Sequence, residues 1–147
     1  MKRLVLFVAA MALAVAGMAY AQATPDFSGT WVLDPAKSDQ MGGGGGGGRG
    51  PAGPMTIKHE GSQLSVTRGE NTTTYKLDGS ETAITGRMQG KATAKVDAGK
   101  LVIKSTFETP NGTMEQTATY TLGADGKELT VVTASTRGER KAVYTKQ

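Results

Sequence analysis

The stretch DFSGTWVLDPAKSD, residues 26–39, decides the fold and contains the one tryptophan of the chain, Trp31. Successive side chains of an extended strand point to opposite faces, so alternate residues share a face. That face carries Phe27, Gly29, Trp31 and Leu33. The pattern predicts a strand over Phe27–Leu33 with Trp31 in the protein core. Because a buried tryptophan contributes a large apolar area, we expect its truncation to cost about 3–5 kcal/mol of stability.

The first 21 residues have the pattern of an export signal. Lys2 and Arg3 precede an apolar run, and Ala19-Tyr20-Ala21 supplies the small-residue pattern that signal peptidase accepts. The run is shorter than the roughly 20 residues of a membrane-spanning helix. We therefore expect residues 1–21 to be removed as a signal peptide and residues 22–147 to form one domain. The protein is then exported, either to the periplasm or out of the cell.

The composition excludes several classes of protein. The formal net charge is +4, and two of these charges lie in the predicted signal peptide, so the charge does not indicate nucleic acid or an anionic membrane surface as a partner. The chain has no cysteine, which excludes disulfides and thiolate metal sites. The stability of the exported domain must then come from packing and from a hydrogen-bonded sheet.

A run of seven glycines occupies residues 42–48. Glycine loses the most backbone freedom on folding, and this run has no side chains to bury in compensation. It therefore predicts a flexible glycine-rich surface loop over about residues 38–54. A phosphate-binding loop is the alternative, but the run is not followed by the Lys-Ser/Thr pair or the helix that such loops need.

From Met55 onward, the sequence has the pattern of short strands joined by tight turns. Threonine and valine are frequent, and Asp-Gly and Asn-Gly pairs supply the positive φ angles of hairpin turns. No window shows the period of a helix. The further expected strands are Met55–Glu60, Gln63–Arg68, Thr72–Leu77, Thr82–Met88, Lys91–Asp97, Lys100–Glu108, Thr113–Leu122, Glu128–Thr136 and Glu139–Lys146.

In most of these strands one face is apolar and the other polar, which indicates a sheet curled around a single core. We predict an all-β protein that forms an antiparallel up-and-down barrel of about eight to ten strands. A β-sandwich is the structural alternative, because the number of strands does not separate the two. An outer-membrane barrel is excluded, since the outward faces lack an apolar band and aromatic girdles.

The Gly29-Thr30-Trp31 tripeptide at the start of the first strand resembles the signature of lipocalins and the wider calycin group. In that group the tryptophan packs across the closed end of the barrel, beneath a basic side chain from near the end of the chain. The resemblance implies structural roles for Gly29 and Trp31 and gives the basic position to Arg140, with Arg137 as the alternative. The longer stretch at residues 26–39 also resembles small secreted lipocalin-like proteins of bacteria. The disulfide and the C-terminal helix of typical lipocalins are absent from this sequence.

A barrel interior of apolar residues with a few polar ones is typical of a ligand cavity. We therefore expect the exported protein to bind a small, mostly apolar molecule. Phe107 and Met114 are the candidates for apolar contact, and Tyr75 and Tyr120 for hydrogen bonds to the ligand. The alternative function is a non-enzymatic structural or interaction module of the cell envelope with a filled core, because small barrels can be packed solid.

Nothing in the sequence indicates catalysis or a bound cofactor. The chain has one histidine, His59, and no Gly-x-Ser-x-Gly motif, so a Ser-His-Asp triad is not expected. A zinc site needs several His or Cys ligands. His59 shares a face with Ile57 and is the only candidate for a haem ligand, but a strand-end role is the simpler interpretation. We expect no enzyme activity, no metal, no cofactor and no membrane span after signal cleavage.

Overall fold

The computed structural model describes residues 24–39, 54–85 and 88–147, and these ranges contain strands and turns but no helix. Ten strands form one antiparallel sheet in the order β4-β3-β2-β1-β10-β9-β8-β7-β6-β5. Their bounds are β1 Gly29–Leu33, β2 Met55–Glu60, β3 Gln63–Arg68, β4 Asn71–Lys76, β5 Asp78–Ile84, β6 Gly90–Asp97, β7 Lys100–Thr109, β8 Gly112–Leu122, β9 Glu128–Ser135 and β10 Gly138–Lys146.

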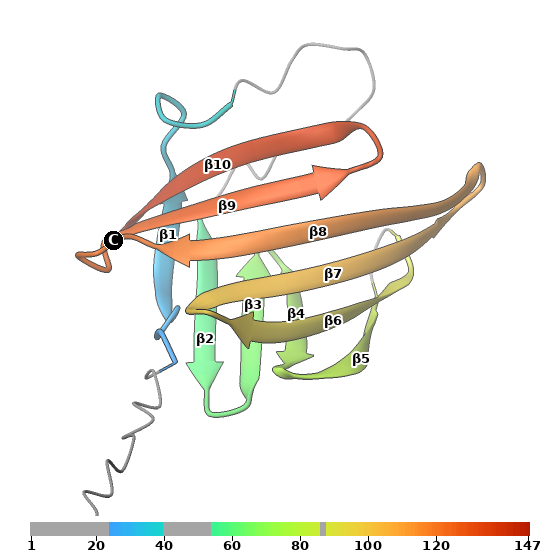
Figure 1. Ribbon diagram of the computed structural model, residues 1–147, viewed down its shortest axis with the longest axis horizontal. Coiled ribbons are helices and arrows are strands. Elements are labelled where there is room, and N and C mark those ends of the chain that lie inside the picture. Colours follow the sequence, from blue (N-terminus) through green and yellow to red (C-terminus); the bar gives the residue numbers. More distant parts are fainter. Residues whose placement is uncertain (1–23, 40–53, 86–87) are drawn as a thin grey trace, which may run out of the picture.

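The sheet curls into a nearly closed barrel. In Figure 1, β1 to β4 run roughly at right angles to β6 to β10, with β1 beside β10 where the two groups meet. The two end strands, β4 and β5, contact each other but exchange no ladder hydrogen bonds. The predicted all-β antiparallel barrel is confirmed, except that its closure leaves the seam between β4 and β5 without a ladder.

The fifth strand differs from the prediction. It was expected at Thr82–Met88, after a turn at Asp78-Gly79-Ser80, but it spans Asp78–Ile84. Leu77 alone connects β4 to β5, and the register against β6 shifts between Asp78 and Glu81. Gly79 has a φ of 81° within this irregularity. The Asp-Gly pair therefore forms a bulge inside a strand, a place that also requires a positive φ.

Trp31 lies fully buried at the centre of its strand. Its Nε1 donates a hydrogen bond to the Phe27 carbonyl oxygen at 3.1 Å, and Phe27 is also fully buried. The other fully buried large side chains are Tyr144, Met55, Ile57, Leu64, Leu101, Leu129 and Val143. The N-terminal stretch and the C-terminal strand thus pack one end of the barrel solid.

The cation above the indole ring is Lys146 and not Arg140. The Lys146 Nζ lies 5.4 Å from the Trp31 ring centroid, a distance at which a cation and an aromatic face attract each other. Lys146 pairs directly with Trp31 across β1 and β10, whereas Arg140 is six residues earlier on β10 and pairs with Thr133. Six residues of a strand span about 20 Å, so Arg140 lies too far along β10 to reach the indole.

Gly29 makes room for this arrangement. Its φ is 144°, which favours glycine, and a Cβ there would lie 2.5 Å from Cε of Lys146. The lysine side chain therefore passes over Gly29 on its way to the Trp31 ring. The Gly-x-Trp pattern has a physical reason here: Gly29 leaves space for the Lys146 side chain, and the Lys146 cation lies over the Trp31 ring.

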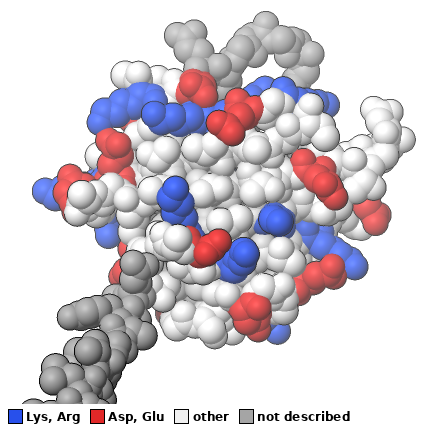
Figure 2. Space-filling model, viewed as in Figure 1, with Lys and Arg blue, Asp and Glu red and all other residues white. Residues whose placement is uncertain are grey.

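The outer surface carries charges of both signs, interspersed over the face that Figure 2 shows. The described residues form two ion pairs, Lys37 with Glu128 at 2.7 Å and Lys91 with Glu81 at 3.3 Å, and all four side chains are well exposed. Exposed ion pairs contribute little stability. The barrel is therefore held by its ladder and its core.

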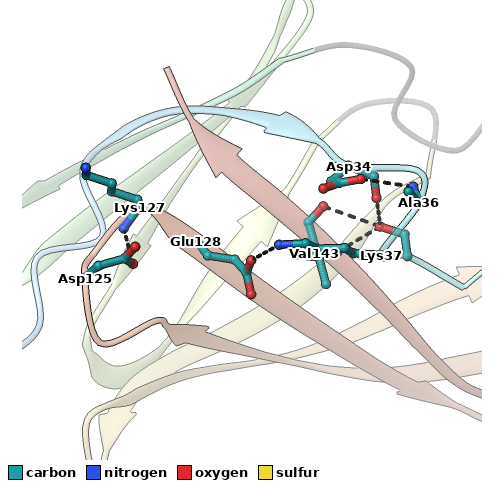
Figure 3. Close-up of polar contacts among 8 residues, drawn as sticks. Asp34, Ala36, Lys37, Asp125, Lys127, Glu128 and Val143 are labelled. Atoms are coloured by element: carbon teal, nitrogen blue, oxygen red, sulfur yellow. Dashed lines mark hydrogen bonds and ion pairs between the residues drawn. The ribbon is translucent and has the colours of Figure 1, made fainter.

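Residues Asp34–Asp39 extend the seam of β1 along β10 (Figure 3). The Asp34 N–H donates to the Val143 carbonyl oxygen at 2.8 Å, and the Val143 N–H donates to the Ser38 Oγ at 2.9 Å. The N–H of Lys141 donates to the Asp39 carboxylate at 2.6 Å. Side-chain oxygens thus replace a strand along part of β10, and the outward side chain of Val143 is buried.

The predicted signal peptide and most of the predicted glycine-rich loop lie outside the described residues. In the three ranges that the structure does describe, no helix is long and apolar enough to cross a membrane.

Candidate functional site

A cavity of about 210 Å³ lies inside the barrel between two pairs of neighbouring strands, and it is partly open to solvent. One wall comes from β3 and β4, and the opposite wall comes from β8 and β9. The residues that line it are Val66, Arg68, Asn71, Thr73, Tyr75, Gln116, Ala118, Tyr120, Val131 and Thr133.

The sizes of the inward side chains explain where this space occurs. Leucine and tryptophan side chains fill the interior around Trp31 and Leu129, where they are fully buried. The inward positions of the cavity walls carry smaller residues instead, such as Thr73, Ala118 and Thr133. Half of the lining residues are Thr, Asn, Gln or Arg, so the cavity is more polar than the sequence predicted.

Arg68 is the one charged residue in the cavity wall. Its side chain is half-buried, and Nη2 donates to the Met55 Sδ at 3.1 Å and to the Tyr120 Oη at 3.4 Å. Both of these acceptors are uncharged. Among the described residues, no carboxylate lies within ion-pair distance of Arg68. The guanidinium group thus enters the barrel without a balancing negative charge.

Three tyrosine side chains, Tyr75, Tyr120 and Tyr144, lie near Arg68. Burial raises the pKa of Tyr75; nearby Tyr120 adds to this rise, and Arg68 opposes it. Burial also raises the pKa of Tyr144, with Arg68 opposing that rise and Tyr120 adding to it. Both phenols therefore stay neutral well above physiological pH, and Tyr75, which lines the cavity, can act as a hydrogen-bond donor to a ligand.

The structure brings two of the four predicted ligand residues to the cavity and leaves two away from it. Tyr75 and Tyr120 line it from opposite walls. Phe107 and Met114 are a cross-strand pair near the tip of the β7–β8 hairpin and do not line it. The reason is that β9 reaches only as far as Gln116 on β8, so Met114 lies on a part of the hairpin that projects beyond β9 (Figure 1).

Sequence reasoning missed Arg68, although a signal was present. Arg68 follows Leu64 and Val66 at alternate positions of one strand, so it shares their inward face. Directly across the ladder lies Met55, which is fully buried. A cation at the end of an apolar, inward face is thus the signal that could have identified Arg68 as part of a site.

His59 lies apart from the cavity. It is half-buried, its backbone N–H donates to the Ser28 Oγ at 2.9 Å, and its ring centroid is 6.2 Å from that of Phe27. Across residues 24–39, 54–85 and 88–147, no three His, Cys, Asp or Glu side chains are grouped so that they could hold a metal ion. The geometry therefore gives His59 a packing role beside Phe27.

Comparison with known proteins was made by sequence and by fold. No family model and no curated protein matches the sequence. Three similar solved structures are the REP1-NXSQ fatty acid transporter, apo Caenorhabditis elegans lipid binding protein 8 and human cRBP IV.

The transporter has a TM-score of 0.60 and 15% identity, over 82% of this chain and 96% of that chain. Lipid binding protein 8 has a TM-score of 0.62 and 15% identity, over 82% of this chain and 95% of that chain. Human cRBP IV has a TM-score of 0.61 and 18% identity, over 84% of this chain and 99% of that chain. At these identities the comparisons establish a shared antiparallel β-barrel fold.

Proposed function

We propose that the protein binds a small amphipathic molecule inside the barrel and does not act on it chemically. The observation that carries this proposal is the cavity between β3–β4 and β8–β9, in which Val66 and Val131 offer apolar contact beside the hydroxyl groups of Tyr75 and Tyr120. A concave, partly apolar space with a few convergent polar groups is the usual form of a small-molecule site.

The similar structures support a carrier role, since two of them are named as a fatty acid transporter and a lipid binding protein. The lining of this cavity contains no histidine, carboxylate or cysteine that could act as a base or nucleophile. Binding without catalysis is therefore the function that its side chains favour.

The test is titration calorimetry with small probes of different chemistry: 1-octanol, p-cresol and octanoate. We expect at least one of them to bind saturably in a one-to-one ratio. In the variant Val131→Trp the new ring fills the cavity, and binding is lost. Val132→Trp is the matched control, because Val132 is the next residue of β9 and points outward.

The result that would contradict this function is an absence of saturable binding by any probe to the folded protein. A barrel that binds none of them would be a structural or interaction module of the cell envelope. Its packed end, with Trp31, Leu129 and Tyr144 fully or almost fully buried, is compatible with that role.

We also propose that the protein works outside the cytoplasm. The support is the export pattern of residues 1–21, in which a basic start and an apolar run precede Ala19-Tyr20-Ala21. Mass spectrometry of the protein recovered from expressing bacteria tests this. The expected N-terminus is Gln22, and a retained Met1 would contradict export by this signal.

A further inference from the structure

The inward faces of the strands carry basic residues but no acidic ones. Partners in an antiparallel ladder share a face, so the buried residues identify the inward positions. Arg68 lies opposite buried Met55, Lys146 opposite Trp31, and Arg140 opposite Thr133 of the cavity wall. The acidic residues of the described strands all occupy the alternate, outward positions: Glu60, Asp78, Glu81, Asp97, Glu108, Glu115, Glu128 and Glu139.

The three inward cations differ in the groups that they contact. Lys146 is engaged by the Trp31 ring at the packed end of the barrel. Arg68 lines the cavity, where only a thioether sulfur and a phenol oxygen accept from it. Arg140 is exposed and pairs with Thr133 of the cavity wall, but it does not itself line the cavity. Arg68 is therefore the inward cation that lines the cavity and has no charged partner among the described residues.

A half-buried cation without a counter-charge costs solvation free energy, which an anion placed beside it would offset. Guanidinium binds carboxylate better than any neutral acceptor, because the two groups match in charge and in geometry. Within the described part of the chain, no protein carboxylate takes this place. The position beside Arg68 is thus suited to a negative group that comes with the ligand.

The cavity volume limits the rest of the ligand. One water-sized group takes about 30 Å³, so about seven such groups fill the 210 Å³ of space. Drug-sized ligands need cavities of about 300–1,000 Å³. Leu101 and Leu129 are fully buried, so no water-sized space reaches either side chain.

We propose that the ligand is a small organic anion of roughly seven to ten non-hydrogen atoms, whose carboxylate or similar group meets Arg68 and whose short apolar part lies between Tyr75 and Tyr120. This inference rests on the proposed function and names the ligand class of the same site. Arg140, the exposed ladder partner of Thr133, adds attraction for anions from solution, an effect that salt screens over about 10 Å.

The first test separates charge from size. Titration calorimetry near neutral pH compares octanoate with 1-octanol and octylamine, which share its chain length but differ in the charge of the end group. We expect octanoate to bind at least about tenfold more tightly than octanol, and octylamine to bind most weakly. In Arg68→Met the preference for octanoate over octanol falls to near unity. Arg68→Lys keeps part of it, and Lys104→Met, which removes an outward cation of β7, leaves it unchanged.

The second test measures chain length with straight-chain acids from butanoate to dodecanoate. Each methylene buried in the cavity should raise the affinity about fourfold, and the increase should stop near hexanoate or octanoate, where the cavity is full. Thermal unfolding of each variant confirms that it is folded.

Each outcome decides the proposal. Equal binding of octanol and octanoate, or an unchanged preference in folded Arg68→Met, overturns the anionic ligand. An affinity that keeps rising through dodecanoate overturns the size limit. In both cases the proposed binding function stands, because a probe still binds and Val131→Trp still abolishes that binding. If no probe binds at all, the proposed function fails, and this inference fails with it.

Discussion

Replacement of Trp31 by alanine tests the account of the packed end of the barrel. The ring is fully buried, so its removal takes about 150–250 Å² of aromatic surface from the core. At about 25 cal/mol per Å² this surface corresponds to about 4–6 kcal/mol, and buried aromatic-to-alanine changes typically cost about 3–5 kcal/mol. The Phe27 carbonyl oxygen also loses its hydrogen bond. We expect a loss of about 4 kcal/mol in the free energy of unfolding, or the absence of a folded state.

The assay is urea unfolding followed by far-ultraviolet circular dichroism, because the variant has no tryptophan fluorescence. Trp31→Phe is the milder companion: it keeps a ring but loses the indole N–H, so we expect a cost of about 1–2 kcal/mol. Lys146→Met tests the cation above the ring and should cost less than about 1 kcal/mol, with no comparable effect from Arg140→Met. A cost below about 1 kcal/mol for Trp31→Ala would refute the reasoning.

Three further predictions concern the seam, a turn and the phenols. Ser38→Ala removes the acceptor of the buried Val143 N–H and should cost about 1–3 kcal/mol in urea unfolding; an effect within error would show that water replaces the hydroxyl. Ala98 has a φ of 48°, so Ala98→Asn should raise the free energy of unfolding by about 0.5–1 kcal/mol, and a decrease would contradict the turn geometry. Burial raises the pKa of Tyr75 and of Tyr144 above the ordinary 10.0, so as the pH rises these phenols ionise in the unfolded chain before they ionise in the folded protein. The two phenols therefore contribute their full stabilisation below about pH 10, and this contribution is lost as the pH rises above it. Urea unfolding midpoints at about pH 8 and about pH 11 measure the loss of stability, and equal midpoints would contradict the prediction.

Most of the strand pattern was predictable because alternation and turn chemistry are local. The expected Met55–Glu60 and Gln63–Arg68 match β2 and β3, and the Asn111-Gly112 pair lies at the turn of the β7–β8 hairpin, as predicted. The displaced β5 shows the limit of local rules. A positive φ at Gly79 fits a hairpin turn and a bulge equally well, and only pairing with β6 decides between them.

The site was harder to predict because it depends on register between distant strands. Both Arg140 and Lys146 occupy inward positions of β10, and their position relative to Trp31 follows from the pairing of β1 with the last residues of β10. The cavity likewise depends on which small side chains meet across the barrel. Ala118 and Thr73 come from strands far apart in sequence, and no local sequence pattern indicates that they line the same cavity from opposite walls.

The measurement that tests the central claim most directly is an NMR titration of isotope-labelled protein with octanoate. The account predicts saturable shifts that are concentrated on the backbone amides of the cavity walls: Val66, Arg68, Thr73, Tyr75, Ala118, Tyr120 and Val131. Shifts confined to outward positions such as Thr119 or Val132, or no shifts in a well-dispersed spectrum, would contradict a ligand site inside this barrel.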